Sequence, residues 1–204
     1  MQYAKKIPQP DPEVREALLA EGWKKIKEPH NLFFAFIFAI PFMIINASIC
    51  YLILLLVNPP SSHMVYDFLY SGSWHFTIRF DYIIYVYLFV VVHELIHLVF
   101  IPNFYRSEKT YIGIKPWGGF VFSTEKFSKG RFLLITIAPF VVFSILALII
   151  LGHTDLLSGF LLFLIFLNAF SSSVDMLNAA LIAFQVPNGS TIINNGFQTY
   201  YKAP

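Results

Sequence analysis

The sequence predicts an all-α integral membrane protein built as a bundle of four transmembrane helices. Of the 204 residues, 57% are hydrophobic and only 13% are charged. A water-soluble protein of this size could not keep so much apolar surface away from water. Four apolar stretches are also long enough to cross a hydrocarbon core of about 30 Å, which takes roughly 20 helical residues.

The four predicted spans define the organisation of the chain. In order, they are residues 32–57, 82–101, 132–152 and 156–184. They form a membrane domain over residues 32–184, which lies between a cytoplasmic N-terminal segment, residues 1–31, and a cytoplasmic tail, residues 185–204. Pro41 in the first span and Pro139 in the third are tolerated where neighbouring helices satisfy the backbone groups that proline leaves unpaired.

The distribution of basic residues predicts the orientation of this bundle. Six basic residues precede the first span and six lie between the second and third spans, whereas Arg79 alone lies on the other side. Because basic residues concentrate in cytoplasmic connections, we expect both termini in the cytoplasm.

The N-terminal segment is predicted to contain one helix before the first span. Asp11-Pro12 is typical of an N-cap followed by proline at the first helical position, and the helix should continue to about Lys27. It is interpreted either as an amphipathic helix at the membrane surface or as a solvated cytoplasmic helix. In the first interpretation, the side chains at the membrane surface are Val14, Leu18 and Trp23.

The connection between the second and third spans should contain a β-hairpin. Residues 110–124 are rich in β-branched and aromatic side chains on both sides of Pro116-Trp117-Gly118-Gly119. Such a pattern is typical of two short strands joined by a turn.

The second span carries the sequence His93-Glu94-Leu95-Ile96-His97, an HExxH motif. Residues four apart project from one face of a helix, so both imidazoles can bind one ion, while Glu94 is offset to the flank. Each ionisable group at the middle of a bilayer costs about 2.5 kcal/mol or more, so this cluster needs a compensating partner. Zinc is the expected cofactor. The alternative is a metal-free hydrogen-bonded cluster or a proton relay.

A catalytic zinc site usually has a third protein ligand, and Asp175 is the main candidate. It is the only charged residue of the fourth span, and none of the spans contains Lys or Arg to neutralise it. His93 lies nine residues before Pro102 and Asp175 nine before Phe184, so both should lie roughly 13 Å from their helix ends. Glu125, after the hairpin, is the alternative ligand, or otherwise a solvated acid.

Further polar residues share a face with Asp175. Asn168, Ser172 and Asp175 are spaced i, i+4 and i+7, and Asn178 lies at the edge of that face. Asn168 is about 10 Å from Asp175 along the helix and cannot bind the same ion. It is expected either to bind an extended substrate backbone, together with Ser172 and Asn178, or to fix helix packing through hydrogen bonds. The histidines outside the spans are interpreted as ordinary interfacial residues; they are His30, His63, His75 and His153.

The chain resembles a bacterial membrane family described as putative zincin peptidases and, more distantly, the site-2 intramembrane metalloproteases. The residues that carry the resemblance are Gly22-Trp23, the HExxH motif, Pro139, and Asn168 with Ser172 and Asp175. The resemblance implies that His93, His97 and Asp175 bind zinc, that Glu94 is the general base, and that the protein lies in a bacterial plasma membrane. Site-2 enzymes have Leu-Asp-Gly where this chain has Val174-Asp175-Met176.

The expected function is therefore a zinc-dependent intramembrane peptidase. A metal-activated water, with Glu94 as general base, would hydrolyse peptide bonds of transmembrane or membrane-associated substrates. The expected partners are membrane lipid and such a peptide, and no nucleic acid. The alternative is a non-hydrolytic metal-binding scaffold or a divalent-metal transporter. A transporter needs polar groups along a path to both sides, and the outer halves of the spans contain almost none.

Overall fold

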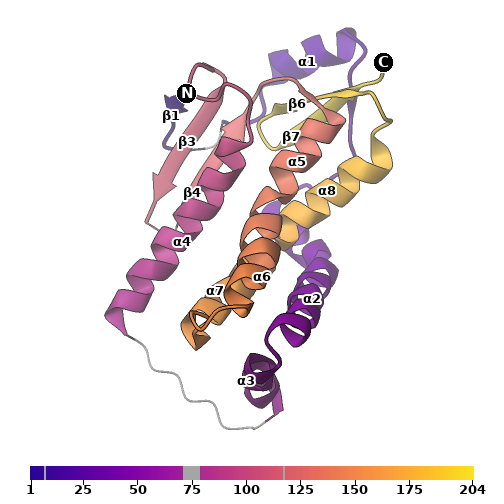
Figure 1. Cartoon of the computed structure of the whole chain (residues 1–204). Helices are drawn as coiled ribbons and strands as arrows, with labels where there is room; N and C mark the ends of the chain where they lie inside the picture. The colour runs from indigo at the N-terminus through magenta and orange to yellow at the C-terminus, as the bar shows by residue number, and fades with distance from the viewer. Residues whose placement is uncertain (7, 71–78, 117) are drawn as a thin grey trace.

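The computed structural model describes residues 1–6, 8–70, 79–116 and 118–204. It is a bundle of helices with two small β-sheets at one end, and both chain termini lie at that end (Figure 1). Among the described residues, four helical segments are long and apolar enough to cross a membrane. They are α2 (Leu32–Val57), α4 (Phe80–Val99), the continuous α5–η1–α6 (Lys129–Gly152), and α7–α8 (Gly159–Gln185).

The helix ends differ from the sequence prediction where a serine caps the helix. The third segment starts at Lys129 because the Ser128 hydroxyl accepts a hydrogen bond from the backbone N–H of Arg131. The fourth starts at Gly159, where Ser158 caps in the same way. A further helix, α3 (Pro59–Tyr70), follows α2 in the connection to α4.

The third and fourth segments are each interrupted once. In the third, α5 (Lys129–Pro139) continues as a π-helix, η1 (Phe140–Leu146), and then as α6 (Ala147–Gly152). In the fourth, α7 (Gly159–Ser171) and α8 (Ser173–Gln185) meet at Ser172. Side chains of α2, η1, α6 and α7 form the main apolar cluster of the bundle, whose fully buried members include Cys50, Leu54 and Leu148.

The predicted hairpin is confirmed. Strands β3 (Thr110–Lys115) and β4 (Gly118–Ser123) pair antiparallel, with Thr110 opposite Ser123 and Lys115 opposite Gly118. Trp117, in the turn, is outside the described residues. Strand β1 (Gln2–Tyr3) joins β3 in parallel, and the hairpin lies along α4 (Figure 1).

A second sheet was not predicted. The segment predicted only as a tail forms β6 (Thr191–Asn195) and β7 (Gln198–Lys202), which pair antiparallel. They lie between β2 (Lys24–Lys25) and β5 (Phe127–Ser128) in the order β2-β7-β6-β5. Gly196 has φ +57° at the first position of the two-residue turn, as a type II′ turn requires. The dipeptide Asn195-Gly196 was the turn signal in the sequence.

The predicted N-terminal helix is shorter than expected. Helix α1 covers Pro12–Ala20, and the Asp11 carboxylate caps it by accepting hydrogen bonds from two backbone N–H groups. The prediction that it continues to Lys27 is wrong, because Gly22 adopts φ +85° and turns the chain into β2.

The apolar side of this segment also has a different partner from the one expected. Leu18 and Trp23 are only 6% and 4% exposed, and both pack against Tyr200 of β7. They therefore belong to a protein core and cannot face lipid. Val14, 42% exposed, stays at the surface.

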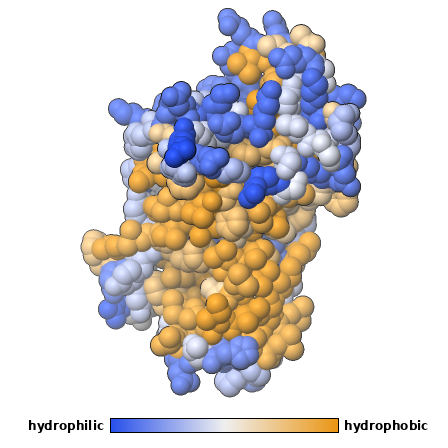
Figure 2. Space-filling view, turned by 45° about the horizontal axis from the view of Figure 1, so that its top comes forward, coloured by the Kyte–Doolittle hydropathy of each residue, from blue (hydrophilic) through white to orange (hydrophobic). Residues whose placement is uncertain are grey.

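The surface of the bundle is strongly apolar. Figure 2 shows a broad hydrophobic area across the middle of the visible face, with hydrophilic areas at both ends. Exposed side chains on α2 alone include Phe36, Ile44, Leu52 and Leu56. Soluble monomers rarely expose large contiguous apolar areas.

The burial of Trp23 predicts a measurable loss of stability in the second sheet. Trp23→Ala should lower the free energy of opening this sheet by about 3 kcal/mol, because it removes a buried aromatic side chain. Leu19→Ala, at a side chain that is 48% exposed, should change it by less than about 0.5 kcal/mol. Amide hydrogen exchange of β6 and β7 measures both. Equal protection in the two variants would contradict the packing described here.

Candidate metal centre

Three side chains from two helices converge inside the bundle. His93 and His97 of α4 direct their Nε2 atoms towards Oδ2 of Asp175 on α8, at 3.5 and 3.6 Å respectively. The three candidate ligand atoms all lie within 4.8 Å of one another. Residues from the second and fourth predicted spans thus meet at the same depth.

Two of the three separations between these atoms fit a tetrahedral zinc ion. With ligand bonds of 2.0–2.1 Å, two ligand atoms of such an ion are separated by about 3.3 Å. The distances from Asp175 to the two imidazoles are close to this value. Two neutral imidazoles and one carboxylate are also a donor set that zinc commonly uses at catalytic sites. The donor types and the two distances to Asp175 therefore fit the ion that the sequence predicts.

Each imidazole has a hydrogen-bond partner on its other nitrogen. His97 Nδ1 lies 2.8 Å from the backbone carbonyl oxygen of Ile135 in α5. His93 Nδ1 lies 2.8 Å from the side-chain oxygen Oδ1 of Asn168 in α7. Both rings are held with Nε2 towards Asp175, which is the usual arrangement for histidines that bind metal.

The contacts of Asn168 favour one of its two interpretations. Its side chain is 1% exposed, and its Nδ2 donates to the carbonyl of Pro139 and to the hydroxyl of Ser144. All polar atoms of the amide are thus engaged within the bundle. This supports a role in helix packing over a role in binding substrate backbone.

The two other residues considered for substrate binding lie in different surroundings. Ser172 is fully buried, and its hydroxyl has no hydrogen-bond partner among the described residues. Asn178, on α8, is exposed. Only Asn178 has the exposure that contact with a substrate requires.

Glu94 lies beside the cluster and outside it. Its Oε2 accepts a hydrogen bond of 3.1 Å from the backbone N–H of Val121 in β4. The backbone of Gly119 also packs against Glu94, since a Cβ at that glycine would lie 3.5 Å from Glu94 Cγ. The carboxylate is therefore positioned between the histidine pair and the hairpin. The sequence predicted the offset of Glu94 but not its contact with β4.

The remaining candidates do not join the cluster. Oε1 of Glu125 accepts a hydrogen bond of 2.7 Å from the Ser107 hydroxyl, and Glu125 is not part of the three-residue group. His30, His63 and His153 are exposed and lie outside this group. His75 is outside the described residues.

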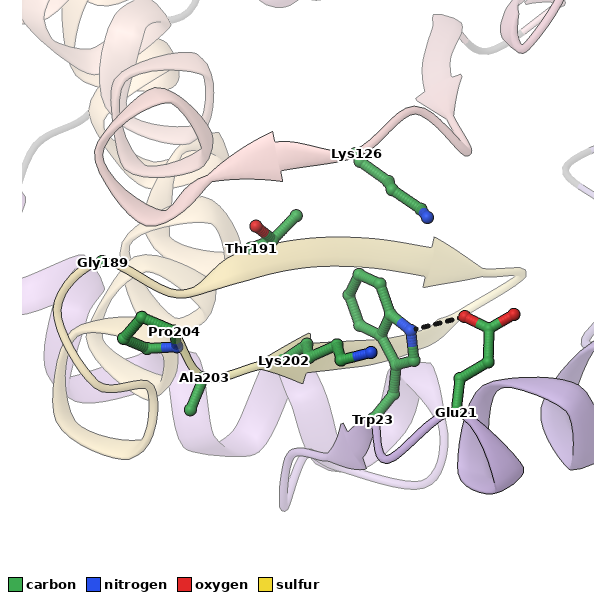
Figure 3. Close-up of a pocket in the computed structure, with 8 residues that line it drawn as sticks. All are labelled: Glu21, Trp23, Lys126, Gly189, Thr191, Lys202, Ala203 and Pro204. Carbon is green, nitrogen blue, oxygen red and sulfur yellow. Dashed lines mark hydrogen bonds between the residues drawn. The ribbon is translucent and has the colours of Figure 1, made fainter.

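A surface pocket of about 250 Å³ lies elsewhere, between the N-terminal segment and the second sheet (Figure 3). Its wall includes the ring of Trp23, whose Nε1 donates to Glu21, and Lys126 lies over that ring at 5.4 Å. None of its lining residues belongs to the His-His-Asp cluster. The pocket is formed where the N-terminal segment packs against the second sheet, and it is separate from the candidate site.

Long apolar helices and a His-His-Asp cluster, of which His93 is buried and the other two residues are part-buried, define the class: a helical protein with a candidate transition-metal centre. Residues 86–191 match the protein family described as Putative zincin peptidase, and the chain belongs to this family. Membership supports a zinc-dependent metallopeptidase. No curated protein and no solved structure matches the chain. The similarity to site-2 enzymes stays a prediction.

The cluster predicts a ligand set that metal analysis can test. Purified protein should hold about one zinc ion per chain, and His93→Ala, His97→Ala and Asp175→Ala should each lose most of it, because two remaining ligands bind zinc weakly. Elemental analysis of the purified variants measures the metal content. Glu125→Ala is the matched control and should retain zinc. If Asp175→Ala kept its full zinc content and Glu125→Ala lost it, Glu125 and not Asp175 would be the third ligand.

Proposed function

We propose that this protein is a zinc-dependent intramembrane peptidase with His93, His97 and Asp175 as the metal ligands and Glu94 as the general base. The observation that carries the proposal is the converging cluster inside an apolar bundle, with a carboxylate next to it that is not a ligand. Membership of the zincin peptidase family supports the peptidase class.

The residues around the site have distinct chemical tasks. Zinc, when bound, polarises a peptide carbonyl and lowers the pKa of water to about 7. Glu94 removes the proton from the attacking water and later donates it to the departing amine. The N–H of Val121 binds one oxygen of Glu94 and leaves the other free for this transfer. A carboxylate fixed on one side is better positioned than a freely rotating one.

The proposed substrates are transmembrane or membrane-associated peptides in an extended form. A helical peptide shields its amides, so the cleaved segment must be unwound. The outer edge of β4 offers backbone groups for pairing with such a segment. Because the N–H of Val121 is already bonded to Glu94, the free pairing positions lie nearer to Gly119. Asn178 is a second candidate contact.

The proposed environment is a lipid bilayer, with the sheet end of the bundle in the cytoplasm. The apolar middle and hydrophilic ends in Figure 2 support a protein that is surrounded by lipid. Thirteen basic residues fall in the segments at the sheet end: six before α2, six between α4 and the predicted third span, and Lys202 in β7. Their placement supports cytoplasmic termini in a bacterial plasma membrane.

If Glu94 is the general base, its replacement should impair catalysis and leave metal binding unchanged. Glu94→Gln keeps the shape of the side chain and removes its basicity. It should bind zinc like the wild type but cleave a reconstituted membrane substrate about 100-fold to 10,000-fold more slowly. Metal analysis and a cleavage assay in proteoliposomes measure the two effects.

Two results would contradict this mechanism in different ways. Undiminished cleavage by Glu94→Gln would show that Glu94 is not the general base. Zinc binding without cleavage of any peptide in a broad membrane panel would favour the scaffold or transporter. A flux assay in proteoliposomes then separates those two, because only a transporter moves the ion.

The proposed topology can be tested with single cysteines. Gln2→Cys and Tyr66→Cys, in a Cys50→Ala background, should react with a membrane-impermeant reagent from opposite sides. Both positions are exposed, whereas Cys50 is fully buried. Residue 2 should react from the cytoplasmic side and residue 66 from the outside. Labelling from the same side would refute the proposed orientation.

A further inference from the structure

Pro139 leaves one backbone carbonyl of the third long helix without its usual helical N–H donor. In an α-helix, the N–H of residue 139 would bond to the carbonyl of Ile135, but proline has no N–H. The next residue does not replace it, since the N–H of Phe140 bonds to Ile137. The Ile135 carbonyl oxygen instead lies 2.8 Å from His97 Nδ1. A carbonyl can only accept, so Nδ1 of His97 carries a proton, and in the neutral imidazole Nε2 then has the lone pair that a metal needs.

The same helix also orients the other histidine, through Asn168. The amide nitrogen of Asn168 donates to the Pro139 carbonyl at 3.1 Å and to the Ser144 hydroxyl at 2.8 Å. Both amide hydrogens are thereby used, which fixes which end of the amide faces His93. Oδ1 then lies 2.8 Å from His93 Nδ1 and accepts its proton in a hydrogen bond. Nε2 of His93 is left free on the side of Asp175.

The π-helix brings these partners together. Ser144 is five residues after Pro139, the spacing at which a π-helix closes its hydrogen bonds, and both residues bond to the same amide nitrogen. The Ser144 hydroxyl donates in turn to the Ile165 carbonyl of α7. The Asn168 side chain is thus held by Pro139 of α5 and by Ser144 of η1.

We propose that Pro139 and Asn168 are positioning residues that hold His97 and His93 in the tautomer with a free Nε2 for the metal. This inference rests on the proposed zinc site, and it assigns the third helix a task in metal binding although that helix supplies no ligand. Partners of this kind commonly change metal affinity 10-fold to 100-fold when removed.

The test compares two site variants with two matched controls in the full-length chain. Asn168→Leu removes the acceptor of His93, and Pro139→Ala restores the backbone donor that competes with His97 for Ile135. Asn46→Leu removes another fully buried amide, which bonds to the Ala169 carbonyl, and Pro41→Ala removes the proline inside α2. Zinc affinity is measured by chelator competition, and ligand geometry by the absorption spectrum of the cobalt-substituted protein.

The two site variants and the two control variants should differ in zinc affinity and in the cobalt spectrum. Asn168→Leu and Pro139→Ala should each bind zinc about 10-fold or more weakly and alter the cobalt spectrum. Asn46→Leu and Pro41→Ala should keep the affinity and spectrum of the wild type. Ser144→Ala should weaken binding less than Asn168→Leu does, and add nothing to it in the double variant, because it acts through Asn168.

The failures of the two proposals are distinguishable. Wild-type affinity and an unchanged cobalt spectrum in both Asn168→Leu and Pro139→Ala would overturn the positioning role and leave the zinc site intact. An equal loss of affinity in the site variants and in the controls would also overturn it, because the effect would then be one of general packing. A wild-type protein that binds neither zinc nor cobalt would overturn the metal centre, and the positioning role with it.

Discussion

The interaction on which the rest of the structure depends is the approach of the Asp175 carboxylate to two imidazoles inside an apolar bundle. A carboxylate in such surroundings is costly unless a cation or several donors compensate it. This requirement brings α8 to α4 at one depth, with 3.5 and 3.6 Å between the polar atoms. Helix α5 is packed against both, since Phe132 belongs to the apolar clusters around Leu98 of α4 and Ile182 of α8. The ligand cluster and the order of the helices are thus consequences of the same contact.

Much of this arrangement could be predicted from the sequence because it follows from local rules. The length and apolarity of a span need no knowledge of its neighbours, and α2 (Leu32–Val57) has the predicted bounds. Helical periodicity placed His93 and His97 on one face, and Asp175 was identified as the only charge in its span. The outer strands of the second sheet, β2 and β5, could not be predicted because they have only two residues each. Strands that short have no periodicity, and their pairing is set by partners far away in the chain.

The contacts around the ligands show where sequence reasoning ends. The position of the carbonyl without its helical N–H donor, four residues before Pro139, can be read from the sequence alone. Which side chain bonds to Ile135 cannot, because that depends on how α4 is rotated against α5. The Asn168 amide and the Val121 N–H are similar cases: the sequence marks a polar residue or a strand, and packing chooses its partner. In this chain, residue types predicted the candidate ligands, and tertiary structure determined the groups that orient them.

The candidate metal ligands and the proposed general base are therefore held in place by different parts of the fold. The candidate metal ligands are held by helices, through the Ile135 carbonyl, which is part-buried, and the Asn168 amide, which is buried. Glu94 is instead bonded to β4, a strand at the edge of its sheet, next to the backbone where an extended peptide would pair. In the proposed enzyme, a peptide that pairs with β4 is thereby placed against the base as well as against the metal. A shift of the hairpin would change the position of the base and the substrate together while the helices keep the ion in place.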